Sequence, residues 1–235
     1  MWDPQWKTFS RSHRVVRYDQ RGFGRSPIGP GRFSNARDLL DLIEQQALES
    51  VALVGVSMGG RIALEVSLAR PELIEALVLV GAGLPGHEWS AEMKAADEAE
   101  EAALACGDLD EAVEVTLRTW VDGPRRRPED VDPEVRARVA EMQRRAYELQ
   151  LPVWETVEEE PLVGDVATRL GEVRARTLVV VGEEDMPDMH QIADRLVREI
   201  PDVRRASIAD TAHVPSLERP RELDALVLPF LQSAQ

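Results

Sequence analysis

A serine between glycines is the residue of this sequence best placed to do chemistry. Ser57 lies in LVGVSMGG, residues 53–60, with Gly55 and Gly59 two positions away on either side. A strand that turns directly into a helix strains the residue at the turn and presents its side chain above the sheet, while small neighbours allow the backbones to approach. We therefore predict that Ser57 is a nucleophile. The N–H of Met58, at the start of the following helix, is the natural donor to an oxyanion formed there.

A serine hydroxyl needs a base to take its proton, and that base must be held in one tautomer by a third group. The four histidines are His13, His87, His190 and His213. His213 follows the last predicted strand, at the edge where ligands bind in parallel sheets, and is the candidate base. The other three fall at a strand start, at the start of a helical region and inside a predicted helix, where surface or structural roles are expected.

The acid of such a triad should follow the strand between the serine and the histidine. VVVGEEDMPD supplies Asp185 just past a predicted strand and before Pro187, in a turn that can aim its carboxylate across the sheet edge. Asp188, three residues later, is the alternative. The predicted order along the chain is Ser57, Asp185, His213.

Short apolar runs rich in β-branched residues alternate with amphipathic segments over most of the chain. This alternation predicts an α/β fold, a mostly parallel sheet with helices on both faces. The expected strands are residues 13–19, 50–56, 75–83, 176–185 and 203–210, and the expected helices are residues 35–47, 61–70, 190–200 and 221–232. Ser34 is the expected cap of the first of these helices.

Residues 87–170 interrupt this alternation with a region rich in Glu, Ala and Arg. Its expected helices are residues 89–105, 109–121 and 133–150, separated by Gly and Pro. We predict a core of residues 1–86 and 171–235 and an inserted helical cap of residues 87–170. Trp120 and Trp154 stand out in this charged insertion, and we expect them either to line an apolar substrate pocket or only to pack the cap onto the core.

The chain has 28 Lys and Arg against 43 Asp and Glu, a net charge of −15. That charge repels phosphate backbones and anionic membranes, so nucleic acid and membranes are not expected partners. The basic run 125–127 is expected to be a solvated loop. A single cysteine and the lack of a leader-like or membrane-spanning apolar run favour a cytoplasmic protein. No metal-ligand motif and no phosphate-binding loop is present, so we expect catalysis without a metal or cofactor.

The sequence resembles the α/β-hydrolase superfamily over essentially its whole length. The matching segments are DQRGFGRS at 19–26, GVSMGG at 55–60, GEED at 182–185 and AHVPSLERP at 212–220. The resemblance implies a nucleophile, acid and histidine in the order found here and a cap inserted after the sixth strand. It is strongest to small bacterial esterases and lactonases, including 3-oxoadipate enol-lactonase-like proteins. Ser57 in place of an aspartate argues against the haloalkane dehalogenase and epoxide hydrolase branches, and Asp210 and Ala212 stand where many members have glycines.

The front of the chain departs from the family pattern. Family members carry three strands before the one predicted at 13–19, and a His-Gly loop after the third of them supplies a second oxyanion donor. No His-Gly dipeptide occurs in this sequence. We therefore expect an N-terminally truncated form of the fold, a fragment or a misplaced start, in which residues 13–19 and 50–56 are not neighbours but flank an absent strand.

The leading hypothesis is a serine hydrolase that cleaves a small carboxylic ester or lactone through an acyl-enzyme. The alternative is a catalytically silent ligand-binding homologue with an incomplete oxyanion hole. Turnover of an ester separates the two.

Overall fold

Four parallel strands form the central sheet of the computed structural model, which describes residues 1–232. They are β2 (Val51–Val56), β3 (Ile74–Val80), β5 (Arg176–Gly182) and β6 (Val203–Ile208), hydrogen-bonded in the order β2-β3-β5-β6. The prediction of an α/β fold with a parallel sheet is confirmed. β2, β5 and β6 lie within runs expected from the sequence, and β3 begins one residue before the expected run 75–83.

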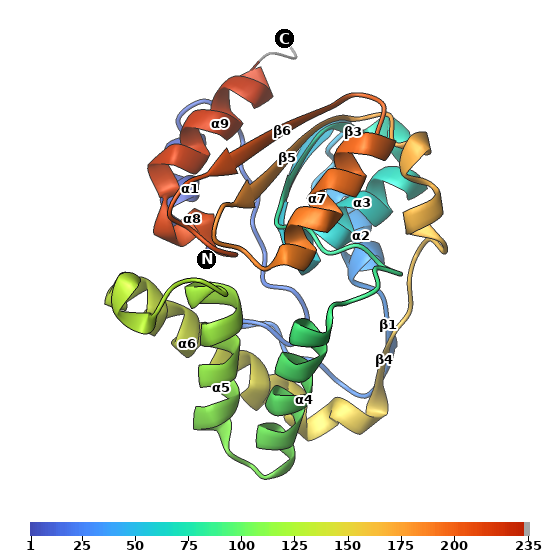
Figure 1. The fold of residues 1–235 in the computed structure, drawn as a ribbon. Coiled ribbons are helices and arrows are strands. Elements are labelled where there is room, and N and C mark those ends of the chain that lie inside the picture. Colours follow the sequence, from blue (N-terminus) through green and yellow to red (C-terminus); the bar gives the residue numbers. More distant parts are fainter. Residues whose placement is uncertain (233–235) are drawn as a thin grey trace.

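Helices cover both faces of this sheet (Figure 1). On one side lie α2 (Asn35–Gln45), α3 (Met58–Ala69) and α7 (Pro187–Glu199), and on the other lie α1 (Asp3–Phe9) and α9 (Pro220–Gln232). Alternate residues of β3 serve the two faces, with Leu77 and Leu79 in one apolar cluster and Val78 and Val80 in the other. Because both faces are buried, β3 is a continuous apolar run, as is typical of parallel strands.

Local signals explain where the flanking helices begin. The Ser34 hydroxyl accepts a hydrogen bond from the Arg37 amide at 3.3 Å, which caps α2 as predicted. Pro187 occupies the first turn of α7, where its missing N–H is not needed. The helix after the serine begins at Met58, three residues before the predicted start, so Ser57 directly precedes it.

Three helices of the region between β3 and β5 pack together beyond the ends toward which the strands run (Figure 1). They are α4 (Ala91–Ala105), α5 (Leu109–Leu117) and α6 (Pro133–Gln150), and a π-helical turn, Arg118–Asp122, continues α5. Their apolar cluster includes Leu117, Val139 and Tyr147 and also takes in Val214, next to His213. We propose that this helical segment, residues 87–170, acts as a cap on the core of residues 1–86 and 171–235.

A two-stranded parallel sheet outside the main one was not predicted. It joins β1 (Gly31–Phe33) to β4 (Val157–Glu159). Each strand has only three residues, too few to show the alternation by which strands are recognised in sequences. This sheet connects the segment before α2 to the end of the helical region.

The strand expected at residues 13–19 is not formed, so the main sheet has four strands and not five. Residues 14–20 have no ladder partner within the described part of the chain, and β2 is bonded to β3 alone. An apolar alternating run becomes a strand only when a neighbour supplies its hydrogen bonds. Val15 nevertheless packs against the apolar cluster of β3 and β5. This run is not paired with β2, but because it forms no strand, the expectation that the two flank an absent strand stays a prediction.

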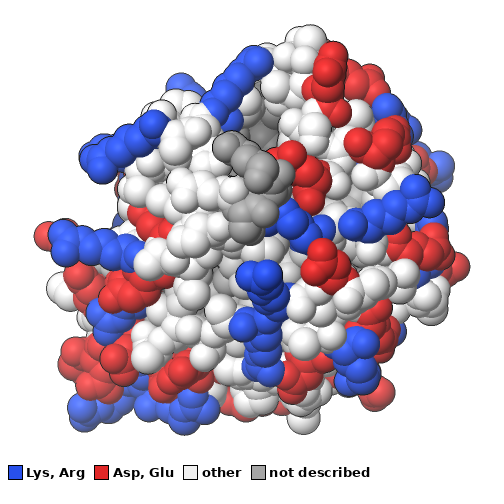
Figure 2. Space-filling view, turned by 90° about the horizontal axis from the view of Figure 1, so that it is seen from above, with Lys and Arg blue, Asp and Glu red and all other residues white. Residues whose placement is uncertain are grey.

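Charged side chains of both signs are interspersed on the face shown in Figure 2, which carries no continuous basic surface. Within residues 1–232, no helix is both long enough and apolar enough to cross a bilayer.

Candidate active site

Ser57 stands between β2 and α3 in a strained backbone conformation. Its φ is 52° and its ψ is −117°, a region that residues with a side chain rarely adopt. Its amide donates to the Val80 carbonyl at 2.9 Å, and its carbonyl accepts from the Gly83 amide at 3.1 Å. Two hydrogen bonds, one to the last residue of β3 and one to the loop that follows it, therefore hold the strain in place.

Close packing around Ser57 explains two of its glycines. A Cβ on Gly55 would lie 2.4 Å from the Gly59 carbonyl carbon, and one on Gly60 would lie 2.5 Å from the Ala82 Cβ. A Cβ on Gly59 would meet only Gln20 Nε2, at 3.9 Å. The prediction that Gly55 must lack a side chain is confirmed. The same prediction for Gly59 is wrong, because its Cβ position is open, and Gly60 is the second crowded position.

His213 and Asp185 form a buried hydrogen-bonded pair. His213 Nδ1 lies 2.9 Å from Asp185 Oδ2, and the other carboxylate oxygen accepts from the Met186 amide at 2.9 Å. A carboxylate can only accept, so we infer that the imidazole carries its proton on Nδ1. Nε2 is then a lone-pair acceptor, and in the described structure it is buried without a hydrogen-bond partner. This is the tautomer that a general base requires.

Gly81 places this pair beside the serine. It follows β3 with φ 46°, and a Cβ there would lie 3.0 Å from His213 Nδ1 and 3.2 Å from Asp185 Oδ2. Ser57 is bonded to the residue just before Gly81. The segments that follow the carboxyl ends of β2, β5 and β6 thus bring the three sequence-predicted residues to one edge of the sheet, next to the end of β3. No hydrogen bond joins the Ser57 hydroxyl to His213 within residues 1–232.

Asp188 binds a different histidine. Its Oδ1 accepts from the Ser90 amide at 2.8 Å and lies 3.2 Å from His87 Nε2. Burial would raise the pKa of Asp188, but the hydrogen bonds from Ser90 and His87 outweigh burial and hold it below its ordinary value. Asp188 therefore ties the start of α7 to the start of the helical segment. The geometry favours Asp185 as the partner of His213.

Trp120 lies against the candidate base, whereas Trp154 does not line an enclosed site. The Trp120 and His213 ring centroids are 4.4 Å apart at 41°, and the Trp120 carbonyl accepts from the His213 amide at 3.1 Å. Trp154 is 59 % exposed, so the structure does not support the expectation that it lines an apolar pocket. Trp154 lies in a 3-10 helix, Leu151–Thr156, that directly follows α6. Its closeness in sequence to the buried residues of α6 suggested a buried position, which the structure does not show.

The sequence reasoning missed several residues that shape the site. Gly81 is one, and Gly182 is another, since a Cβ there would lie 2.1 Å from the Ala212 carbonyl oxygen. The basic run expected to be a solvated loop contains Arg126, which is only 12 % exposed and bonded to Glu218 at 2.8 Å. A usable signal for the glycines was present, because a Val-Gly dipeptide lies at or next to the carboxyl end of three strands, at 54–55, 80–81 and 181–182.

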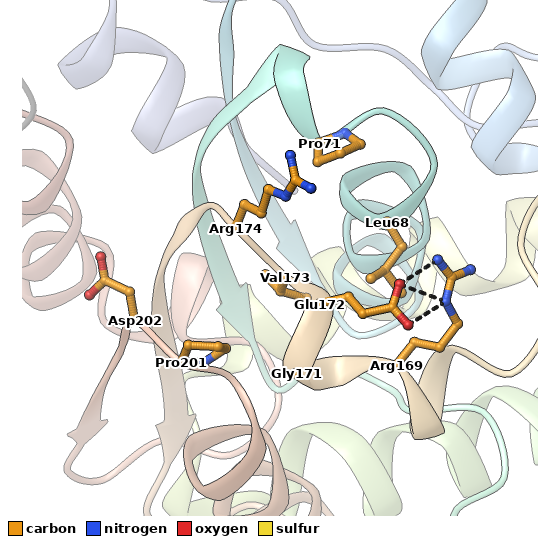
Figure 3. Close-up of a pocket in the computed structure, with 9 residues that line it drawn as sticks. All are labelled: Leu68, Pro71, Arg169, Gly171, Glu172, Val173, Arg174, Pro201 and Asp202. Carbon is orange, nitrogen blue, oxygen red and sulfur yellow. Dashed lines mark hydrogen bonds and ion pairs between the residues drawn. The ribbon is translucent and has the colours of Figure 1, made fainter.

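A cavity of about 650 Å³ lies away from this edge (Figure 3). Its lining includes Leu68 and Pro71, which precede β3, Arg174, which precedes β5, and Pro201, which precedes β6. These residues mark the amino ends of the strands, opposite Ser57. Figure 3 shows the Arg169 and Glu172 side chains paired with each other in this cavity. Within the described residues, no three His, Cys, Asp or Glu side chains gather as a metal site.

Known proteins resemble this chain over nearly its whole length. The “Putative carbamate hydrolase RutD” of Rhizobium rhizogenes is 28 % identical over 250 residues, which cover 99 % of this chain and 87 % of that protein. The 2-hydroxy-6-oxononadienedioate/2-hydroxy-6-oxononatrienedioate hydrolase of Cupriavidus pinatubonensis is 26 % identical over 238 residues, covering 96 % and 81 %. The crystal structure of a hydrolase from Pseudomonas aeruginosa PA01 is 26 % identical with a TM-score of 0.76, covering 98 % of this chain and 84 % of that one.

A family model described as “Alpha/beta hydrolase family” matches residues 1–226, nearly the whole chain. The chain belongs to the alpha/beta hydrolase family.

Proposed function

We propose that the protein is a serine hydrolase that cleaves a small carboxylic ester or lactone through an acyl-enzyme. The observation that carries this proposal is the Asp185–His213 hydrogen bond, which leaves a buried, unpartnered Nε2 at the edge of the sheet where the strained Ser57 also lies. Family membership supports the reaction class, and the names of the two sequence relatives support hydrolysis.

The proposed reaction begins when the Ser57 hydroxyl attacks the substrate carbonyl carbon. His213 Nε2 takes the hydroxyl proton, and Asp185 stabilises the resulting imidazolium. The Met58 N–H, at the amino end of α3, donates to the oxyanion. His213 then protonates the leaving alkoxide, and the same base activates the water that hydrolyses the acyl-enzyme. The lack of a Ser57–His213 hydrogen bond is compatible with these roles, because such bonds often tighten only when substrate binds.

The proposed pocket is apolar and lies under the helical segment. Trp120 forms the part of its wall that covers His213, and Met58 and Trp89 pack against the same apolar cluster as Trp120. A wall of this kind suits a small neutral acyl group. We propose that the protein works in the cytoplasm on small molecules and needs no metal or cofactor.

A substrate panel tests the proposal against the silent ligand-binding alternative. It comprises nitrophenyl esters of increasing acyl length, simple lactones and, because of the relative's name, a nitrophenyl carbamate. We expect the wild type to turn over short esters or lactones and Ser57→Ala to lose turnover by roughly 10⁴-fold or more. Ser10→Ala, at an exposed position, is the matched control. A folded wild type that binds these compounds without turnover would favour the silent alternative.

A further inference from the structure

Arg126 joins the helical segment to the loop that carries His213. Its guanidinium donates from Nε to the Asp122 carbonyl at 2.9 Å and from Nη1 to the Asp210 carbonyl at 3.0 Å. A further N–H, on Nη2, bonds to the Val121 carbonyl. Asp122 and Val121 belong to the π-helical turn Arg118–Asp122, and Asp210 opens the His213 loop, residues 210–214. One planar group therefore fastens the two segments to each other.

Glu218 extends this link to the residues directly before His213. Its Oε2 accepts from Arg126 Nη1 at 2.8 Å, while its Oε1 accepts from the Thr211 hydroxyl at 2.7 Å and from the Ala212 amide at 3.0 Å. The side chains of Arg126 and Glu218 are 12 % and 6 % exposed. A buried ion pair of this kind fixes geometry, because each partner satisfies the other in a site with little water.

The π-helical turn also contacts His213 directly. The Trp120 carbonyl accepts from the His213 amide, and the Trp120 ring lies on the imidazole. Asp122, the last residue of the turn, receives two hydrogen bonds from Arg136 at 2.9 Å each, which anchor the turn to α6. Gly123 approaches the acid side as well, since a Cβ there would lie 2.2 Å from the Glu184 carbonyl oxygen. Insertions of π-helix often mark functional sites.

We propose that Arg126 is a positioning residue for the reaction. By locking the π-helical turn onto the His213 loop, it holds the imidazole where Nε2 can serve Ser57 and keeps Trp120 over the ring. This role rests on the proposed function. Lysine cannot replace Arg126, because an ammonium has three donors on a flexible stem, whereas the guanidinium presents five in a rigid plane.

The test compares Arg126→Lys with Arg127→Lys, a matched control in the same basic run whose side chain is 77 % exposed. Arg126→Lys keeps the charge opposite Glu218, so we expect a folded protein. Its kcat on the best ester should fall by about 10²-fold, with little change in KM, because a shift of about 1 Å in a catalytic group has that effect. Arg127→Lys should match the wild type. Equal kcat in the two variants would overturn the proposal.

Chemical rescue separates positioning from support of the fold. In Arg126→Ala, methylguanidinium at a non-denaturing concentration should restore part of the lost kcat. It should not change the kcat of Arg127→Ala. A loss of kcat that parallels the loss in melting temperature across the variants, and that methylguanidinium does not reverse, would contradict a positioning role.

A second readout keeps this proposal distinct from the proposed function. If the wild type hydrolyses none of the panel, the proposed function fails, but the link can still be measured by amide hydrogen exchange. The Ala212 and His213 amides should exchange faster in Arg126→Lys than in Arg127→Lys, because their partners depend on Arg126. Equal exchange at these amides would overturn the inferred link whatever the activity.

Discussion

At the scale of single residues, Asp185 and Asp188 lie three positions apart yet bind different histidines. Asp185 holds Nδ1 of His213, and Asp188 holds His87 together with the Ser90 amide. The first contact sets the tautomer of the candidate base, and the second attaches the helical segment to α7. The two carboxylates should therefore differ in what their removal does.

Replacing each carboxylate by its amide is the corresponding prediction. Asp185→Asn should lower ester kcat by about 10⁴-fold, because the amide no longer fixes the proton on Nδ1. Asp188→Asn should leave most of the kcat and mainly lower the melting temperature. Steady-state kinetics on both variants, with circular dichroism as the control for folding, provide the measurement. The reverse order of effects on kcat would assign the acid to Asp188.

The sequence favours Asp185 as the acid but leaves Asp188 as an alternative. Asp185 comes just past the predicted strand and before Pro187, and Asp188 follows three residues later. Ser57 and His213 were recognisable because each stands at a junction with its own local pattern, a glycine-flanked turn and the loop after the last strand. The partners of a carboxylate depend on packing from segments distant in sequence, here the residues around His87, which no local pattern records.

At the scale of elements, a predicted strand forms only where a neighbouring strand pairs with it. The runs 50–56, 75–83 and 176–185 are apolar and rich in β-branched residues, and they contain strands that have neighbours on at least one side; the more polar run 203–210 forms the edge strand β6 beside β5. Residues 13–19 were expected to form a strand on the same pattern, yet they have no strand partner in the described chain. Pattern predicts the capacity to pair, and only the assembled sheet supplies the pairing.

Two alanine substitutions test the packing of the serine turn. Gly55→Ala should destabilise the protein by about 1–3 kcal/mol or more, because its Cβ would overlap the Gly59 backbone. Gly59→Ala should keep or raise stability, by up to about 1 kcal/mol, because alanine favours the first turn of α3 and its Cβ has room. Denaturant unfolding of both variants measures the difference. Equal destabilisation by the two substitutions would contradict the conclusion that a Cβ at Gly59 has room.

The contact of Asp188 with His87 and Ser90 should make the attachment of the helical segment acid-sensitive. The pKa of Asp188 is lowered from 3.8 in the folded protein, so its contribution to stability is complete above 3.8 and is lost as pH falls through the folded value. The wild type should melt above Asp188→Asn near neutral pH, and this gap should close below pH 3.8. Melting curves across the acid range provide the measurement. A gap that stays constant there would exclude a role for the Asp188 charge.

At the scale of the whole molecule, net charge and sheet topology have opposite effects on self-association of the protein. The outer edge of β2 has no strand partner in the described chain, and such edges favour association. The net charge of −15 at pH 7 opposes association by mutual repulsion. Repulsion vanishes near the isoelectric point of about 4.8.

We therefore expect association that depends on pH and salt. Light scattering should rise as pH approaches 4.8 and fall again when pH is restored, and added salt at pH 7 should produce a smaller rise by screening. A protein that stays monodisperse at its isoelectric point would show that the β2 edge is protected by other means.

The central claim is that Ser57 is a nucleophile activated by the His213–Asp185 pair, and covalent labelling tests it most directly. The folded protein is treated with a fluorophosphonate probe, and the modified peptide is identified by mass spectrometry in the wild type, Ser57→Ala, His213→Ala and Ser10→Ala. We predict one label on the peptide that contains Ser57, loss of that label in the first two variants and full labelling in the Ser10 control. Labelling that persists in Ser57→Ala, or a folded wild type that takes no label, would contradict the claim.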